Sequence, residues 1–291
     1  MFVFRVASDL TVVELQNLTH ATTGFGYHVG MTDTLLVVGC YDLNANQGGA
    51  FVYARASSAA DYIFKQSLLP LATLNLATSF YGFDVAICDN NYIAVSAPEE
   101  LSVRLGVTIT AGAVHVFKRN SGTGNYVELA DMPITTYNPD GDDWFGRSIA
   151  CVDTTLVIGA DQDNHDDMIQ VFNTGSVSVL HRGSDDKFTL VSKLFGRTAG
   201  DRLGWGAAMK DSSTIVVGAV AADNNRGLVY LIERVSSTAY NITQTWAPGA
   251  GVVASGSVAL GRDVAISSDN VIVGGAFLDG SGSTGSVLVF A

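Results

Sequence analysis

Five similar segments recur along the chain, and this repetition constrains the fold more than any other feature. Each segment opens with an aromatic residue or a leucine beside a glycine, continues as a short strand, turns at an aspartate and ends in a second, apolar strand. The opening glycines are Gly26, Gly82, Gly146, Gly204 and Gly261, which are separated by 56, 64, 58 and 57 residues. Repeats of this length are typical of arrays in which each unit buries its apolar faces against its neighbours.

A third strand and a more polar fourth strand complete each unit. The third strands open at Gly48, Gly112, Gly175, Gly227 and Gly285. The last unit lacks a fourth strand, but residues 11–18 ("TVVELQNL") resemble residues 125–132 ("NYVELADM"), which form the fourth strand of the second unit. Joining the two chain ends at this point again gives a spacing of 56 residues.

The sequence therefore predicts an all-β fold, a five-bladed β-propeller of four-stranded antiparallel blades, because a ring leaves no unpaired edge when the amino-terminal strand completes the last sheet. We expect residues 1–291 to form a single domain. Its blades, called repeats one to five below, are residues 24–70, 80–132, 144–195, 203–247, and 260–291 with 1–18. Residues 2–4 also resemble the end of a third strand, which leaves open that the chain comes from a longer repeat array.

Composition excludes some classes of partner. Hydrophobic residues make up 47% of the chain and charged residues 15%, so most strands must be covered on both faces. The net charge of −12 would repel phosphate backbones and anionic lipid heads. No apolar run reaches the roughly 20 residues that cross a bilayer, and the amino terminus lacks a signal-peptide pattern. We expect neither nucleic-acid binding nor membrane insertion.

The three cysteines fall within or at the end of apolar strands. Cys40, Cys88 and Cys151 have no paired spacing, and a thiol in such a place behaves as a small hydrophobe. The sequence predicts three buried free thiols and no disulfide framework.

The repeat resembles the FG-GAP repeat family. A Phe-Gly opening stands at Phe25-Gly26 and Phe145-Gly146, and the Val-Gly-Ala strand end stands at residues 217–219. The resemblance implies a propeller used in adhesion, recognition or scaffolding, and an extracellular or cell-surface location. Integrin propellers, which are relatives, hold calcium in loops patterned Asp-x-Asp-x-Asp-Gly-x-x-Asp.

The connections between second and third strands differ in length from repeat to repeat. From the small residue that ends the second strand to the glycine of the third, they span 9, 16, 16, 9 and 11 residues. Repeats two and three therefore carry neighbouring insertions. In a propeller these connections share a face with the loop before each first strand, so both insertions should meet residues 137–144, where function carried by loops is expected.

The two insertions supply apolar residues for a contact surface. Residues 101–109 alternate apolar and mostly polar positions, which is typical of a half-covered strand, and residues 168–172 add a second apolar stretch. Either these residues fold back on the ring or they bind a partner. The leading hypothesis is a non-catalytic module that binds another protein or a second copy of itself. Its binding residues would be Val103, Leu105, Val107, Asp140, Asp142, Trp144, Met168 and Phe172.

Acidic residues of the repeat-three insertion suggest a calcium site. Oxygen ligands at alternating positions can surround Ca²⁺. The candidate ligands are Asp161, Asp163, Asp166 and Asp167. The segment lacks the glycine and the ninth-position acid of the integrin pattern, and its simpler interpretation is a solvated acidic loop.

Two further functions stay open. Trp144 or Trp205 could stack on a sugar in a carbohydrate-binding module, assisted by calcium, although both also fit a packing role. A glycoside hydrolase is the third alternative, because Asp84 and Asp263 occupy equivalent places after their opening glycines. These strands offer no glutamate and no catalytic motif, so we expect no enzyme.

Overall fold

The computed structural model describes residues 1–6, 11–69, 78–104, 107–136, 141–164, 172–249, 258–276 and 285–290, with the backbone alone at residues 103, 104 and 107. Across these ranges the chain consists of β-strands and two four-residue helices, α1 (Leu43–Asn46) and α2 (Ala222–Asn225). The predicted all-β class is confirmed. No helix within the described ranges is long and apolar enough to cross a membrane.

Each repeat folds into its own antiparallel sheet, in which its strands lie in chain order. Repeat one forms β3 (Val29–Met31), β4 (Leu35–Cys40), β5 (Gly49–Ala54) and β6 (Ile63–Leu68). Repeat two forms β7 (Val85–Asp89), β8 (Tyr92–Ala97), β11 (Ala113–Arg119) and β12 (Tyr126–Glu128). Repeat three forms β13 (Phe145–Val152), β14 (Thr155–Ala160), β15 (Ser176–Arg182) and β16 (Phe188–Phe195). Repeat four forms β17 (Leu203–Asp211), β18 (Thr214–Ala219), β19 (Leu228–Ser236) and β20 (Ala239–Trp246).

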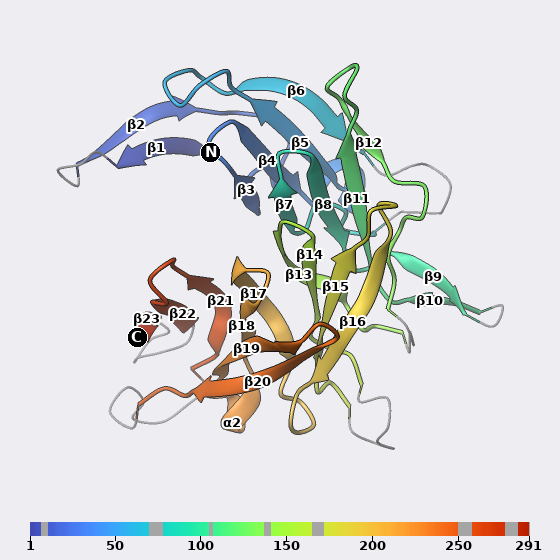
Figure 1. Cartoon of the computed structure of the whole chain (residues 1–291), viewed down its shortest axis with the longest axis vertical. Helices are drawn as coiled ribbons and strands as arrows, with labels where there is room; N and C mark the ends of the chain where they lie inside the picture. The colour runs from blue at the N-terminus through green and yellow to red at the C-terminus, as the bar shows by residue number, and fades with distance from the viewer. Residues whose placement is uncertain are drawn as a thin grey trace.

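Repeat five forms a three-stranded sheet of β21 (Leu260–Ile266), β22 (Ile272–Ala276) and β23 (Ser286–Phe290). The five sheets follow one another around a common centre (Figure 1). Their first strands β3, β7, β13, β17 and β21 lie innermost, and the fourth strands lie outermost.

The recurring glycines allow neighbouring sheets to approach each other closely. The third-strand glycine of one repeat bridges the opening residue of the next, as Gly48 does with Tyr81 and Gly112 with Phe145. Gly48 has a φ of +83°, and a Cβ atom there would lie 1.8 Å from the carbonyl oxygen of Tyr81. Only glycine fits this contact, which explains why the glycine recurs in the four repeats that have a following sheet.

The hydrophobic core is divided among the spaces between successive sheets. Leu35 and Val37 of repeat one pack with Ile93 and Val95 of repeat two, and each later pair of repeats shares a similar cluster. Both faces of a second strand such as β8 are therefore buried, as its mostly apolar sequence predicts.

The amino-terminal strands correct the predicted ring closure. β2 (Val12–Asn17) pairs with β1 (Phe2–Val6) in a separate hairpin, and Figure 1 shows β2 and β23 well apart on two sides of an opening. The predicted pairing of residues 11–18 with the last sheet is therefore wrong. Residues 2–4 belong to β1. Because β2 already pairs with β1, only the other edge of β2 could pair with a further strand.

The hairpin nevertheless packs as part of the repeat. Val3 and Leu18 join a buried cluster with repeat one, and the Gln16 side-chain amide bonds both the N–H and the carbonyl of Tyr62 at 2.9 Å. Gln66 makes the same pair of bonds, each 2.8 Å, to Tyr126 of repeat two. β1 and β2 thus stand where the third and fourth strands of a preceding repeat would stand.

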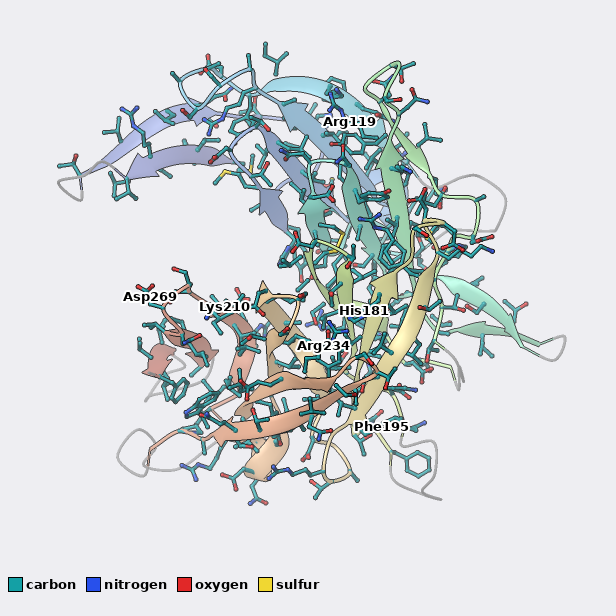
Figure 2. The ribbon with its side chains drawn as sticks, viewed as in Figure 1. Arg119, His181, Phe195, Lys210, Arg234 and Asp269 are labelled. Atoms are coloured by element: carbon teal, nitrogen blue, oxygen red, sulfur yellow. A yellow bond between two sulfur atoms is a disulfide. The ribbon has the colours of Figure 1, made fainter. Side chains whose placement is uncertain are left out.

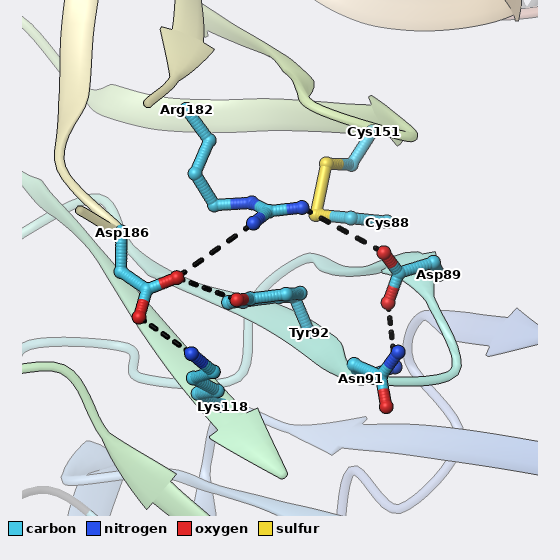
Figure 3. A network of polar contacts seen from close by, with 8 residues as sticks. All are labelled: Cys88, Asp89, Asn91, Tyr92, Lys118, Cys151, Arg182 and Asp186. Carbon is cyan, nitrogen blue, oxygen red and sulfur yellow. Dashed lines mark hydrogen bonds and ion pairs between the residues drawn. A yellow bond between two sulfur atoms is a disulfide. The ribbon is translucent and has the colours of Figure 1, made fainter. Parts of the chain in front are cut away.

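Two cysteines depart from the prediction of free thiols. Cys88 and Cys151, at the ends of neighbouring first strands, form a disulfide (Figure 3). Beside it, the Arg182 guanidinium lies 3.7 Å from the centre of the Tyr92 ring, and the Tyr92 hydroxyl donates to Asp186 at 2.6 Å. The prediction is wrong for this pair, which links repeats two and three covalently.

The third cysteine agrees with the prediction, because Cys40 is buried and free.

Hydrogen bonds between turns also join neighbouring sheets. For example, Lys210 of repeat four donates to Asn270 of repeat five at 2.7 Å, near Asp269 in Figure 2.

Candidate functional site

An open cavity of about 860 Å³ lies where the inner strands of the five sheets converge. Residues of β3, β13, β17, β21, β22 and β23 line it, together with Phe83 and Asp84 just before β7. Every repeat therefore contributes to its wall. The position immediately after each opening glycine faces this space, and so does the next position.

The first of these positions forms a stack of rings and guanidinium groups. Its members are Tyr27, Phe83, Arg147, Trp205 and Arg262. The Tyr27 and Phe83 ring centres are 5.0 Å apart, and the Arg147 Cζ atom lies 4.8 Å from the Phe83 centre and 4.0 Å from that of Trp205. The Arg262 Cζ atom is 5.7 Å from the Trp205 centre. Such distances are typical of cation–π contacts, so the stack runs through all five repeats.

The second position joins repeats one to four through polar contacts. His28 Nδ1 lies 2.6 Å from Asp84 Oδ1, and Asp84 Oδ2 accepts the Ile149 N–H at 2.7 Å. The Ser148 hydroxyl donates to the Gly204 carbonyl at 2.9 Å. A row of polar contacts thus lies next to the stack of rings and guanidinium groups.

The neighbouring acidic groups raise the pKa of His28 above its ordinary value. The Asp84 carboxylate raises the pKa of His28 by its charge and by a hydrogen bond, and burial opposes the rise. The charge of Asp263 raises the same pKa further. His28 of repeat one and Asp263 of repeat five both line the cavity. Asp84 and Asp263, predicted at equivalent places, are therefore brought to one site.

Arg147 carries a positive charge into an apolar setting. Its side chain is 10% exposed, and Trp144 lies beside it, with the guanidinium 5.5 Å from the ring centre. Burial lowers the pKa of Arg147, against the attraction of Asp161. Its Nε atom has no hydrogen-bond partner within the described residues.

Asp161, a predicted metal ligand, serves as the counter-charge of two arginines. Its side chain is 1% exposed, with oxygens 3.8 Å from Arg147 Nε and 3.9 Å from Arg202 Nη1. Burial raises the pKa of Asp161 to about 6, although both arginines oppose the rise. A carboxylate held in this way is not on a solvated loop.

Asp163 is likewise engaged inside the protein. It accepts a hydrogen bond from the Ser176 hydroxyl at 2.5 Å and pairs with Lys193 Nζ at 2.9 Å. Asp166 and Asp167, the other two predicted ligands, lie outside the described residues. Within the described part of the chain, no group of three or more histidine, cysteine or acidic side chains could hold a metal ion.

The three enlarged loops meet at one end of repeats two and three, as predicted. The Asp142 N–H donates to the Thr110 carbonyl, and the Gln162 N–H donates to the Asp143 carbonyl at 3.3 Å. The repeat-two insertion forms its own hairpin, β9 (Leu101–Arg104) with β10 (Val107–Thr110), which projects outward in Figure 1.

We call four of the exposed and half-exposed side chains on these loops the loop face: Thr108, Asp142, Trp144 and Phe172. Phe172 is 60% exposed, whereas Trp144 is half-buried and lies 6.1 Å from the Phe83 ring. The loop face therefore adjoins the cavity at Trp144. Of the other predicted binding residues, Val103 and Val107 are described by backbone alone. Leu105, Asp140 and Met168 lie outside the described residues.

Sequence reasoning missed the stack of rings and guanidinium groups. The signal was present, because the residue after the opening glycine varies among aromatic and basic types while the glycine before it recurs. A side chain that faces the central cavity does not share the packing of the rest of the repeat, so its type can differ from one repeat to the next.

One comparison with known proteins found a match, and it concerns the repeat. No curated protein matches the chain. Residues 133–180, which contain β13, β14 and most of β15, match the family model described as the FG-GAP repeat. The resemblance inferred from the sequence is thus confirmed by a match of this segment to the FG-GAP repeat.

Proposed function

We propose that this chain is a non-catalytic interaction module, a propeller-type array of five repeats that binds a partner protein, or a second copy of itself, through the loop face. The observation that carries the proposal is the meeting of three loops through backbone hydrogen bonds, together with the 60% exposure of Phe172, which belongs to one of them, the repeat-three insertion. Exposed aromatic side chains on loops held by a scaffold are common anchors of protein interfaces. The FG-GAP repeat supports the same class of function, because the family serves mainly in recognition and adhesion.

The polar residues of the cavity support a binding role over a catalytic one. Both oxygens of Asp84 accept backbone N–H groups, from Val85 and Ile149, and the carboxylate is buried. The Ser148 hydroxyl donates to a backbone carbonyl. Groups engaged in this way hold neighbouring sheets together.

The test compares two exposed phenylalanines. Partner proteins captured by the immobilised chain would be identified, purified and titrated against wild type, Phe172→Ala and Phe64→Ala. Phe64, on the outer strand β6, is 52% exposed and serves as the matched control. Self-association would be measured in parallel by sedimentation.

We expect Phe172→Ala to weaken binding about tenfold or more, since truncating an interface anchor costs about 2 kcal/mol or more. Phe64→Ala should leave affinity within about twofold. Equal affinity for wild type and Phe172→Ala would reject the loop face. Turnover of glycosides by the purified protein, abolished in Asp84→Asn, would reject the non-catalytic assignment.

A further inference from the structure

The stack around the cavity ends in two exposed members. Tyr27, at the repeat-one end, is 48% exposed, and Arg262, at the repeat-five end, is also exposed. Phe83 and Arg147 in the middle are nearly buried. A ligand that enters the cavity therefore meets an open aromatic ring on one side and a guanidinium group on the other.

The charge around Trp205 favours an anionic group. Three guanidinium carbons lie 4.0 to 5.7 Å from its ring centre, those of Arg147, Arg202 and Arg262. The described carboxylate that faces two of them, Asp161, is 3.8 Å or more from either, which is longer than a hydrogen bond. In a partly buried site an added anion gains more from such charges than it would in water.

The next position carries groups that bond hydroxyls in repeats one and five. Asp263 Oδ1 accepts the Val264 N–H at 2.9 Å, its side chain is exposed, and the cavity includes it. His28 has a 45% exposed side chain. Carboxylate and imidazole groups bond hydroxyls, but a second carboxylate near Asp263 would be repelled. The wall therefore suits a ligand that carries an anionic group at one end and hydroxyls elsewhere.

A sugar that carries a carboxylate group fits these features together. We propose that the central cavity binds a hexuronic acid unit of an acidic glycan. The sugar carboxylate would lie toward Arg262 and Arg147, the ring face would lie against Tyr27, and the hydroxyls would lie toward His28 and Asp263. The volume of about 860 Å³ is within the range of roughly 300–1,000 Å³ common for small-ligand sites. This site is independent of the protein contact assigned to the loop face.

The test uses monosaccharides as probes. Glucuronate and galacturonate would be titrated by calorimetry, with glucose and galactose as neutral counterparts and acetate as a carboxylate without a ring. The variants are Arg262→Ala and Tyr27→Ala, both at exposed positions, so loss of folding is not expected. Arg119→Ala is the matched control, because Arg119 lies on β11 away from the cavity (Figure 2).

At least one uronate should bind more tightly than its neutral counterpart and than acetate. Arg262→Ala should weaken that binding about tenfold or more, in line with a charge-assisted hydrogen bond, and Tyr27→Ala should weaken it severalfold. Arg119→Ala and Phe172→Ala should leave it unchanged, which separates this site from the loop face. The proposal fails if neither uronate exceeds its neutral counterpart, if acetate binds as well, or if Arg262→Ala binds like wild type.

Discussion

A buried histidine makes the stability of repeat two depend on pH. His115, on β11, is buried between two carboxylates, with Nε2 2.7 Å from Glu100 and Nδ1 2.5 Å from Glu128. Burial lowers the pKa of His115, but the hydrogen bonds and charges of both glutamates outweigh that effect and raise it to about 9. Glu100 lies directly before β9, so this pair also anchors the repeat-two insertion.

The direction and size of the effect follow from proton binding. Between pH 6.5, the ordinary pKa, and about 9, the folded chain binds a proton that the unfolded chain has released. The stabilisation is fully present below pH 6.5 and is lost as pH rises through about 9. At 1.36 kcal/mol per pKa unit, the loss amounts to about 3 kcal/mol of unfolding free energy.

Urea unfolding at a series of pH values from about 6 to about 10 measures this loss. His115→Gln, which cannot become charged, is the comparison, because the other groups that titrate in this range are common to both proteins. Wild type should lose about 3 kcal/mol more than the variant, with hydrogen exchange rising first in β9 and β10. Equal pH dependence in the two proteins would refute the assignment of a charged His115.

The remaining predictions concern the disulfide, the amino-terminal hairpin and calcium. Cys88→Ser should cost up to about 4 kcal/mol of unfolding free energy in denaturant titrations without reductant, since the bond spans 63 residues of sequence; a reductant without effect on wild type would contradict this. Gln16→Ala should raise hydrogen exchange in β1 and β2 and cost about 1 to 3 kcal/mol, because both backbone groups of Tyr62 lose a partner; unchanged protection would contradict the docking. Calcium should leave the melting temperature unchanged, because Asp161 and Asp163 already face arginine and lysine; an increase that Asp163→Asn abolishes would restore the metal site.

The repeat could be predicted from the sequence because one backbone requirement recurs in each unit. Gly48 and its equivalents are fixed by contact with the next sheet, so the pattern survives wherever a sheet has a neighbour. The strand order and the meeting of the enlarged loops followed from that pattern. Both depend on connections within and between adjacent repeats.

The errors arose where a strand or side chain has more than one partner available. Residues 11–18 were correctly identified as similar to a fourth strand. The similarity does not determine which third strand they pair with, and they pair with β1, which is nearer in the chain. Cys88 and Cys151 seemed unpaired because their spacing fits no motif. Their shared place at the end of neighbouring first strands was the signal for the disulfide.

The stack and the polar contacts around the cavity could not be predicted from the sequence. The identity of Tyr27, Arg147 and Arg262 could be read from the repeat, but their contacts depend on how closely the first strands converge. Asp161 appeared to be a loop residue because it follows β14 directly, yet it is buried beneath Arg147.

The central claim is that equivalent residues of the first and last repeats face one cavity, and the pKa of His28 tests it most directly. Proton NMR titration of the His28 ring should give a pKa above the ordinary value in wild type, because Asp84 and Asp263 both favour the charged ring. Asp84→Asn should lower it most, and Asp263→Asn should lower it by a smaller amount. A His28 pKa that does not respond to Asp263→Asn would contradict the shared cavity.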